Sequence, residues 1–169
     1  MKKIILLLAM LVVLAACSNE AKTDSASETT NSAPTFALKD TTGKTYNLDY
    51  YKGKKVYLKF WASWCPICLS GLEEVDTLAT EEEDFVVLSV VAPGFNNEKK
   101  TDAFIKWISG VEEVKNLPVL LDEDGVIAKQ YGILGYPTSV FISSDGALIK
   151  TSPGHLSNDQ IKEQFDSID

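Results

Sequence analysis

The stretch Trp61-Ala62-Ser63-Trp64-Cys65-Pro66-Ile67-Cys68 holds two cysteines separated by two residues. It follows residues 56–60, a run of valine, tyrosine, leucine, lysine and phenylalanine that is typical of a strand. After it, apolar side chains recur at helical spacing, at Leu69, Leu72, Val75 and Leu78. The sequence therefore predicts that the cysteine pair lies where a strand passes into a helix.

That position favours reactive cysteines. The first turn of a helix has unpaired N–H groups and partial positive charge, which stabilise a thiolate and lower the pKa of the thiol. Pro66 suits this turn because it has no N–H and a fixed φ. We expect Cys65 at the mouth of the helix, where it attacks a disulfide of a partner protein. Cys68, deeper in the first turn, then resolves the mixed disulfide.

Two other uses of the pair are weaker. A purely structural disulfide that closes so short a loop would add little stability. A zinc site needs about four ligands, and the chain offers only one further cysteine, Cys17, and one histidine, His155. The spacing therefore indicates redox chemistry, and we expect no metal and no other cofactor.

The cysteine motif and a second segment together resemble those of a known family. The Trp-Cys-Pro-Ile-Cys motif, together with Tyr136-Pro137-Thr138, resembles the thioredoxin fold, and more narrowly the TlpA/ResA type of extracytoplasmic thiol–disulfide oxidoreductase. Residues 58–65 and Ala92-Pro93-Gly94-Phe95, followed by Glu98-Lys99-Lys100, are similar to a subgroup that supplies electrons to methionine sulfoxide reductases. The resemblance implies an α/β thioredoxin fold over residues 35–169, with an N-terminal β-hairpin and a central insertion.

The resemblance also implies how the substrate is held. It places a cis Tyr136–Pro137 bond against the cysteines, which leaves neighbouring backbone groups free to pair with an extended substrate strand. The substrate-binding residues expected on this basis are Trp64, Pro66, Ile67, Tyr136, Pro137 and Thr138. An apolar docking surface would add Trp61 and Phe95, although either ring could equally belong to the core.

Lys59 departs from the family pattern. It stands six residues before Cys65, where thioredoxins proper carry a buried acid that assists proton transfer. A buried lysine is costly unless it is neutral or paired. Lys59 could help to stabilise a thiolate, or its amine could extend to solvent, and we expect the second. TlpA-like members often place a glutamate where this chain has Gly71, so the group that transfers protons stays open. His155 is expected at the surface or at a helix cap.

The N-terminus carries an export signal. Residues 1–16 combine two lysines with a short apolar run, as in a signal peptide. The Leu-Ala-Ala-Cys sequence that ends at Cys17 resembles a bacterial lipobox, which implies that Cys17 is lipidated. Residues 17–34 then form a flexible linker without large apolar side chains. We therefore expect an extracytoplasmic domain anchored by lipid to the cell membrane.

The charge of the chain limits the partners it can bind. The 169 residues carry a net charge of −8 and no arginine, which argues against nucleic acid as a partner.

Alternating residues around a Thr-Gly turn predict a hairpin over residues 35–47, and residues 85–91 read as a buried parallel strand. Thr101 is expected to cap one helix, and residues 157–160 form a capping box that opens the last.

These signals predict an extracytoplasmic, lipid-anchored reductase of partner-protein disulfides, with a methionine sulfoxide reductase as its client. The family implies that a CcdA-type membrane thiol transporter restores the dithiol. A disulfide-forming oxidant and a reductase for cytochrome c maturation are alternatives, as is a non-catalytic surface binding module.

Overall fold

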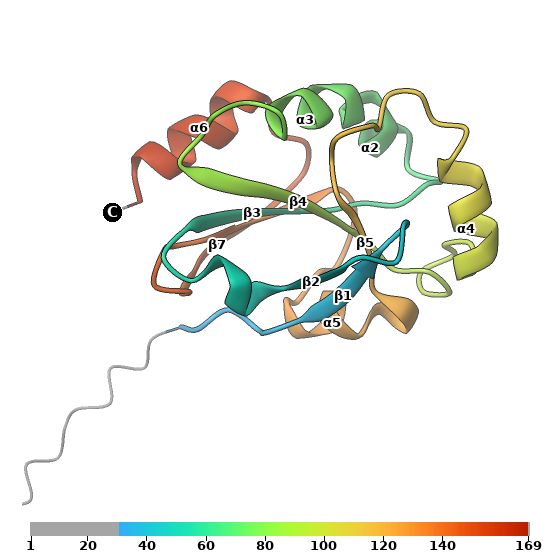
Figure 1. Ribbon diagram of the computed structural model, residues 1–169, viewed down its shortest axis with the longest axis horizontal. Coiled ribbons are helices and arrows are strands. Elements are labelled where there is room, and N and C mark those ends of the chain that lie inside the picture. Colours follow the sequence, from blue (N-terminus) through green and yellow to red (C-terminus); the bar gives the residue numbers. More distant parts are fainter. Residues whose placement is uncertain (1–30, 169) are drawn as a thin grey trace, which may run out of the picture.

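The computed structural model describes residues 31–168, so the leader, Cys17 and most of the linker lie outside the described residues. A seven-stranded sheet with the order β2-β1-β5-β4-β3-β6-β7 forms the centre of the described part (Figure 1). Its strands are β1 (Ala37–Asp40), β2 (Thr45–Asn47), β3 (Lys55–Phe60), β4 (Phe85–Val91), β5 (Val119–Leu121), β6 (Thr138–Ile142) and β7 (Leu148–Pro153).

The middle of the sheet is parallel and buried on both faces. β3 runs parallel to β4, and β4 runs parallel to β5, whereas β6 and β7 are antiparallel additions. In β3 and β4 nearly every side chain is inaccessible to solvent, as expected for continuous apolar runs in a parallel sheet. This confirms residues 85–91 as a buried parallel strand.

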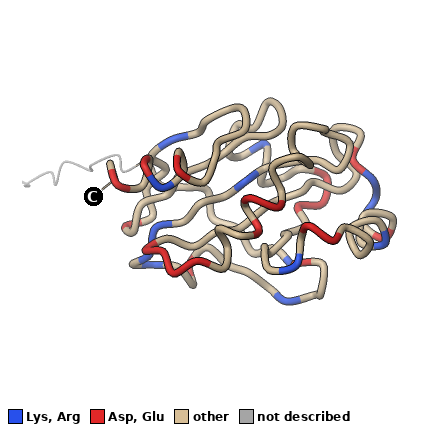
Figure 2. Tube along the Cα trace, turned by 90° about the horizontal axis from the view of Figure 1, so that it is seen from above, with Lys and Arg blue, Asp and Glu red and all other residues tan. Residues whose placement is uncertain are grey.

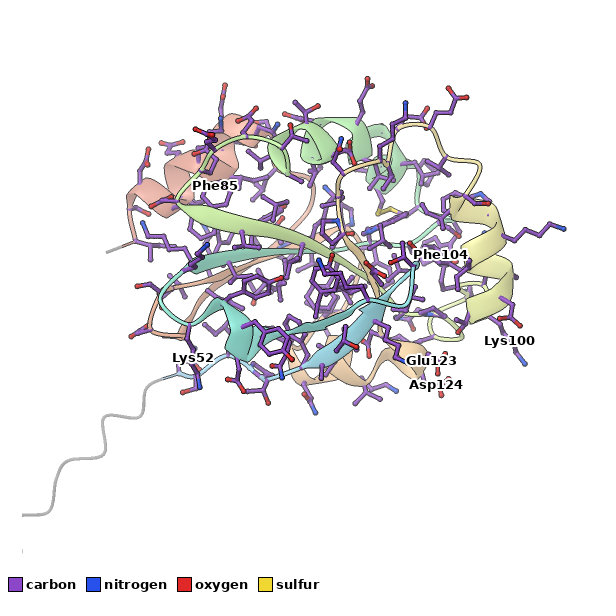
Figure 3. The ribbon with its side chains drawn as sticks, viewed as in Figure 1. Lys52, Phe85, Lys100, Phe104, Glu123 and Asp124 are labelled. Carbon is purple, nitrogen blue, oxygen red and sulfur yellow. A yellow bond between two sulfur atoms is a disulfide. The ribbon has the colours of Figure 1, made fainter. Side chains whose placement is uncertain are left out.

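Helices cover both faces of the sheet. In Figure 1, α2, α3 and α6 lie above the sheet, α5 lies below it, and α4 lies beside the end of the sheet near β5. Phe104 points from α4 toward the strands (Figure 3). The helices are α2 (Pro66–Ser70), α3 (Leu72–Leu78), α4 (Thr101–Ile108), α5 (Val126–Gln130) and α6 (Asn158–Asp166), with single 3₁₀ turns at Leu48–Tyr51 and Glu123–Gly125.

The sheet therefore separates two apolar cores. One lies under α2, α3, α4 and α6, and it contains both cysteines of the pair. The other lies between the sheet, the β1–β2 hairpin and α5. Because side chains alternate along a strand, β3 supplies both cores at once, with Tyr57 facing the first and Leu58 the second.

Of the two helix caps predicted from the sequence, one is confirmed and the other is wrong. The capping box at Ser157 is confirmed, because its hydroxyl accepts the Gln160 N–H while the Gln160 side chain accepts the Ser157 N–H. The predicted Thr101 cap is wrong, since Lys100 occupies the N-cap position. The Thr101 hydroxyl instead donates to Oε1 of Glu123 at 2.8 Å, a partner that lies 22 residues away.

The hairpin is also confirmed, as β1 pairs with β2 in antiparallel register. Residues just before it contact the folded body. The Leu148 N–H donates to the Asn31 carbonyl at 2.7 Å, and the Tyr131 hydroxyl donates to the Pro34 carbonyl at the same distance. Residues 31–34, which the sequence assigns to the linker, therefore pack against β7 and α5.

The distribution of charge and the character of the helices are relevant to what the described part of the chain can bind. Figure 2 shows lysines interspersed with acidic residues along the trace. Within residues 31–168, no helix has the length and apolar character needed to cross a lipid bilayer.

Candidate active site: the Cys65–Cys68 disulfide

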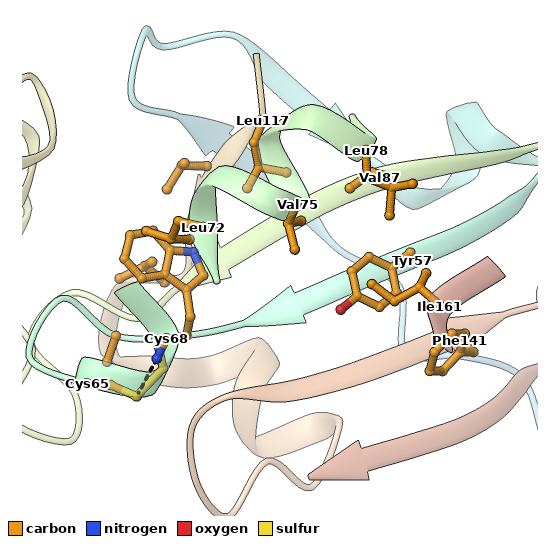
Figure 4. Packing of buried hydrophobic residues seen from close by; sticks show 14 of the residues in the cluster. Tyr57, Cys65, Cys68, Leu72, Val75, Leu78, Val87, Leu117, Phe141 and Ile161 are labelled. Atoms are coloured by element: carbon orange, nitrogen blue, oxygen red, sulfur yellow. Dashed lines mark hydrogen bonds between the residues drawn. A yellow bond between two sulfur atoms is a disulfide. The ribbon is translucent and has the colours of Figure 1, made fainter. Parts of the chain in front are cut away.

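The cysteine pair lies at the predicted junction. β3 ends at Phe60, and α2 begins at Pro66 with Cys65 as its N-cap residue. Cys65 and Cys68 form a disulfide, and the Cys68 N–H donates to Sγ of Cys65 at 3.2 Å (Figure 4). This hydrogen bond points at the sulfur that would carry negative charge when the disulfide is reduced, and a donor so placed stabilises a thiolate.

The two cysteines differ in how much of their surroundings is exposed to solvent. Cys68 has no exposed surface and Cys65 keeps 5 %. Beside Cys65, Trp64 is 48 % exposed and Ile67 is 61 % exposed, and Pro66 is also exposed. The side of the disulfide that a partner protein can approach is therefore the Cys65 side.

A second loop faces the disulfide. The Tyr136–Pro137 bond is cis, as the resemblance implied. The Tyr136 carbonyl oxygen lies 3.8 Å from Sγ of Cys65, and the Tyr136 ring packs against Trp64 with the ring centroids 6.0 Å apart. Pro137 and Thr138 are buried, and the Thr138 hydroxyl donates to the Gly135 carbonyl at 2.8 Å. The expected substrate-binding residues thus lie on the two loops that meet at the disulfide. Trp64, Pro66 and Ile67 are exposed, Tyr136 is half-buried, and Pro137 and Thr138 are buried.

Two aromatic residues that could have belonged to a docking surface pack against the domain, Trp61 fully buried and Phe95 half-buried. Trp61 has no exposed surface and contacts the rings of Phe104 and Trp107. Phe95 packs so closely on Gly125 that a Cβ there would lie 2.3 Å from its ring, and Lys129 covers the ring at 4.4 Å. Both residues therefore belong to the packing of the domain.

Leu134 shows the opposite behaviour. It is 97 % exposed and lies two residues before Tyr136. Sequence reasoning missed it because a single apolar residue between two turns gives no periodic signal.

A buried carboxylate holds the active-site loop in place. Glu98 accepts the Ser63 N–H at 2.5 Å through Oε2 and the Ser63 hydroxyl at 2.6 Å through Oε1. Nζ of Lys99 donates to the same hydroxyl at 2.6 Å. The loop that follows β4 is thereby fixed to the residue two positions before Cys65. The sequence could not reveal this contact, because 35 residues separate the partners.

Lys59 contradicts its predicted extension to solvent. Its side chain is fully buried, and Nζ has no hydrogen-bond partner among the described residues. Burial lowers the pKa of Lys59 to about 8, and the negative charge of Glu74 partly opposes that shift.

His155 lies against the helix that carries Glu74. Nε2 of His155 is 3.3 Å from Oε2 of Glu74, and a Cβ at Gly71 would lie 2.4 Å from the His155 ring. About a third of the side chain is exposed, so His155 packs at the surface as expected. Within residues 31–168, no three or more histidine, cysteine or acidic residues gather closely enough to hold a metal ion.

A disulfide at a strand-to-helix junction, faced by a cis-proline loop, defines a thiol–disulfide oxidoreductase with the thioredoxin fold. Sequence comparison agrees. The chain belongs to the Redoxin family, whose model matches residues 28–166.

Individual relatives support both the fold and the activity. The crystal structure of the exposed lipoprotein thioredoxin Etrx1 from Streptococcus pneumoniae is 47% identical, with a TM-score of 0.77, and the match covers 80% of this chain and all of that one. The N-terminal domain of PilB from Neisseria gonorrhoeae is 33% identical, with a TM-score of 0.69 and coverage of 73% and 83%. The thiol–disulfide oxidoreductase ResA from Bacillus thuringiensis is 31% identical over 136 residues, which are 80% of this chain and 76% of ResA.

Proposed function

We propose that this protein reduces disulfides of partner proteins outside the cytoplasm, while anchored to the membrane by lipid on Cys17, and that its client is a methionine sulfoxide reductase. The observation that carries the proposal is the Cys65–Cys68 disulfide, which is buried on its Cys68 side and bordered by exposed apolar residues on its Cys65 side.

The geometry supports a division of roles between the cysteines. In the reduced protein, Cys65 attacks the client disulfide, because its sulfur faces Tyr136 and the exposed Trp64 and receives the Cys68 N–H. A mixed disulfide forms and one client sulfur leaves as a thiolate. Cys68 then attacks Cys65, the second client sulfur leaves, and the Cys65–Cys68 disulfide remains.

The shape of the site supports an extended substrate. Trp64, Pro66 and Ile67 offer apolar surface on one side of the disulfide, and Leu134 offers it near the cis-proline loop. A client segment with apolar residues flanking its cysteine would bury surface on both sides, whereas a charged segment would lose solvation without a partner.

The client class rests on the chain's resemblance. Methionine sulfoxide reductases form a disulfide during catalysis and need a reductant for each turnover. The Ala92-Pro93-Gly94-Phe95 and Glu98-Lys99-Lys100 segments resemble thioredoxin-like domains that serve these enzymes, and Glu98 fixes this loop to the active site. Repair of oxidised methionine would thus be the purpose of the reducing power.

The anchor and the electron supply are proposals of the same kind. Cys17 lies outside the described residues, and its lipidation is supported by the lipobox-like sequence and by similarity to a protein described as an exposed lipoprotein. Two acyl chains would hold the domain stably at the membrane. A CcdA-type membrane thiol transporter would return Cys65 and Cys68 to the dithiol.

A reconstituted assay tests the proposal. The reduced chain from residue 18 onward is mixed with an oxidised methionine sulfoxide reductase and a methionine sulfoxide substrate, and turnover is followed. We expect turnover with the wild type, none with Cys65→Ser, and a trapped mixed disulfide with Cys68→Ser. If the protein instead inserts disulfides into a reduced polypeptide and leaves the reductase oxidised, it is an oxidant. Binding that survives Cys65→Ser without any thiol exchange would indicate a binding module.

A further inference from the structure

A cavity of about 360 Å³ lies beside α2, the helix that begins at the disulfide. This volume is within the range of about 300–1,000 Å³ that is usual for binding sites. Its apolar walls come from α2, α3, α4 and the loop after α4, and they consist of Leu69, Leu72, Trp107 and Val111. Three exposed polar residues also line it, namely Ser70, Glu73 and Glu113. The exchange steps described above do not use this cavity.

The cavity lies close to the reactive cysteine. Leu69, in its wall, donates its N–H to the Cys65 carbonyl at 3.1 Å. Because a helix rises about 1.5 Å per residue, Ser70 at the end of α2 lies only about 8 Å along the helix axis from Cys65. An extended client advances about 3.3 Å per residue, so a side chain about two to four residues from the attacked cysteine reaches the cavity.

The aromatic wall of the cavity is held by the active-site loop. The Trp107 ring lies 6.3 Å from the Trp61 ring, centroid to centroid. Nζ of Lys99 lies 5.0 Å from the centre of the Trp107 ring and donates to the Ser63 hydroxyl at 2.6 Å. The charge of Lys99 is opposed by Glu98, which accepts a hydrogen bond from the same hydroxyl. The wall is therefore fixed in position without a net positive charge behind it.

Glu73 and Glu113 bring two carboxylates to the cavity from separate segments of the chain. Neither side chain forms an ion pair or a hydrogen bond with another of the residues from 31 to 168. No lysine is among the residues that line the cavity. Other glutamates do find a cation, since Glu81 and Glu83 share Lys162. The cavity thus combines apolar walls with an acidic rim that is not neutralised within the described part of the domain.

The loops that border the disulfide offer no comparable charge. Residues 61–72, which lead into α3, contain no charged side chain, and neither do residues 131–144 around the cis-proline. A basic side chain of a client would therefore lose solvation beside these loops, whereas at the cavity it meets two carboxylates and an aromatic ring. This complementarity of charge identifies the occupant that suits the cavity.

We propose that the cavity binds a lysine or arginine side chain of the client, about two to four residues from the cysteine that Cys65 attacks. The charged end lies between Glu73 and Glu113, and the aliphatic part covers Trp107 and the leucine side chains. An acidic residue at the same client position is repelled. The inference rests on the proposed exchange at Cys65 and adds a feature by which the client is recognised.

The expected preference is moderate. The two glutamates are exposed, so each ion pair is partly screened by water and salt. The contact between the cation and the Trp107 ring adds to them. Together these contacts should make a client with the basic residue react about 10-fold faster than a neutral one, and the advantage should shrink as the salt concentration rises.

Synthetic peptides test the proposal. Each peptide of glycine, alanine and serine carries one cysteine, capped as a mixed disulfide with an aromatic thiol. A lysine or a glutamine stands about two to four residues away on either side. The reduced full-length chain, held in detergent, is mixed with each peptide in a stopped-flow instrument. As Cys65 bonds to the peptide sulfur, the old disulfide breaks and the aromatic thiol leaves as a coloured thiolate, because it is the better leaving group.

The comparison is between lysine and glutamine peptides of the same spacing. In the wild type we expect the second-order rate constant to be about 10-fold higher for lysine at the spacing that reaches the cavity. In the double variant Glu73→Gln/Glu113→Gln the advantage should disappear. The matched control is Glu112→Gln/Glu163→Gln, which removes the same charge from exposed residues that do not line the cavity, and it should keep the advantage.

The outcomes are distinct. Equal rate constants for lysine and glutamine at every spacing in the wild type overturn the role of the cavity and leave exchange at Cys65 in place. An advantage that survives in Glu73→Gln/Glu113→Gln, or that falls as far in the control, also overturns it, because the attraction then comes from the net charge of the domain. If no peptide releases the thiolate, exchange at Cys65 itself is contradicted, and the inference fails with it.

Discussion

Replacement of Lys59 by methionine should make the folded protein more stable at neutral pH. The pKa of Lys59 falls from 10.5 to about 8 because folding buries the amine. Since each pKa unit corresponds to about 1.4 kcal/mol, keeping the proton on Lys59 at pH 7 costs the folded state about 3 kcal/mol relative to the unfolded chain. Methionine has a similar unbranched shape and no charge, so Lys59→Met should recover that amount without leaving a cavity.

The sign of the pH dependence follows from the direction of the shift. The folded state binds its proton more weakly than the unfolded state, so the penalty is fully present below about pH 8 and disappears as the pH rises toward 10.5. Urea unfolding of the oxidised proteins at pH 7 and pH 10 measures the difference. We expect Lys59→Met to exceed the wild type by about 3 kcal/mol at pH 7 and by about 1 kcal/mol or less at pH 10.

Two results would show that the buried charge of Lys59 does not destabilise the folded state. One is a methionine variant that is no more stable than the wild type at pH 7. The other is a gain that persists unchanged at pH 10, since it would then come from packing and not from the removal of a charge. Lys106→Met is the matched control, because Lys106 is exposed, and its effect should stay within about 0.5 kcal/mol.

Further predictions concern three contacts around the site, each checked by urea unfolding. Glu98→Gln should cost about 2 kcal/mol, because an amide cannot accept all the donors that the carboxylate accepts. Asp76→Asn should be destabilising at pH 7, and its deficit should shrink below about pH 4, because hydrogen bonds outweigh burial and hold the pKa of Asp76 below its usual value. Gly71→Ala should cost about 1 kcal/mol because the new Cβ displaces the His155 ring from its contact with Glu74, whereas Gly135→Ala, with no atom within 4 Å, should be tolerated.

Each of these predictions has its own contradiction. A Glu98→Gln variant as stable as the wild type would mean that the clamp on the active-site loop contributes nothing. If the loss of stability in Asp76→Asn stays the same below about pH 4, the hydrogen bonds of Asp76 do not lower its pKa. Equal changes in stability for Gly71→Ala and Gly135→Ala would mean that the His155 ring does not lie close to Gly71.

Much of the fold follows from short-range signals. The change from a strand pattern to helical spacing around Cys65 marks the junction at the site, and the local hydrogen-bonding preferences of Ser157 and Gln160 mark the start of α6. The cis bond before Pro137 came from the family resemblance and not from any local pattern. Such features depend on neighbouring residues or on a shared motif, so a single sequence is enough to predict them.

Contacts between distant segments were not predictable in the same way. The burial of Lys59 depends on α2 and α3 covering β3, and a lysine in a strand is normally a sign of an exposed position. Thr101 has the side chain of a helix cap, but Glu123 competes for its hydroxyl. The clamp between Glu98 and Ser63 likewise exists only when two loops meet, and neither segment signals the other.

The proposed function requires that the Cys65–Cys68 pair works as a reductant. The most direct test is the reduction potential of this pair, measured by equilibrating the chain from residue 18 onward with glutathione buffers and quantifying the dithiol. We expect a value close to that of thioredoxin, about −270 mV, so that the dithiol gives its electrons to client disulfides. A value of about −120 mV, that of a strong disulfide-forming oxidant, would show that the pair does not work as a reductant.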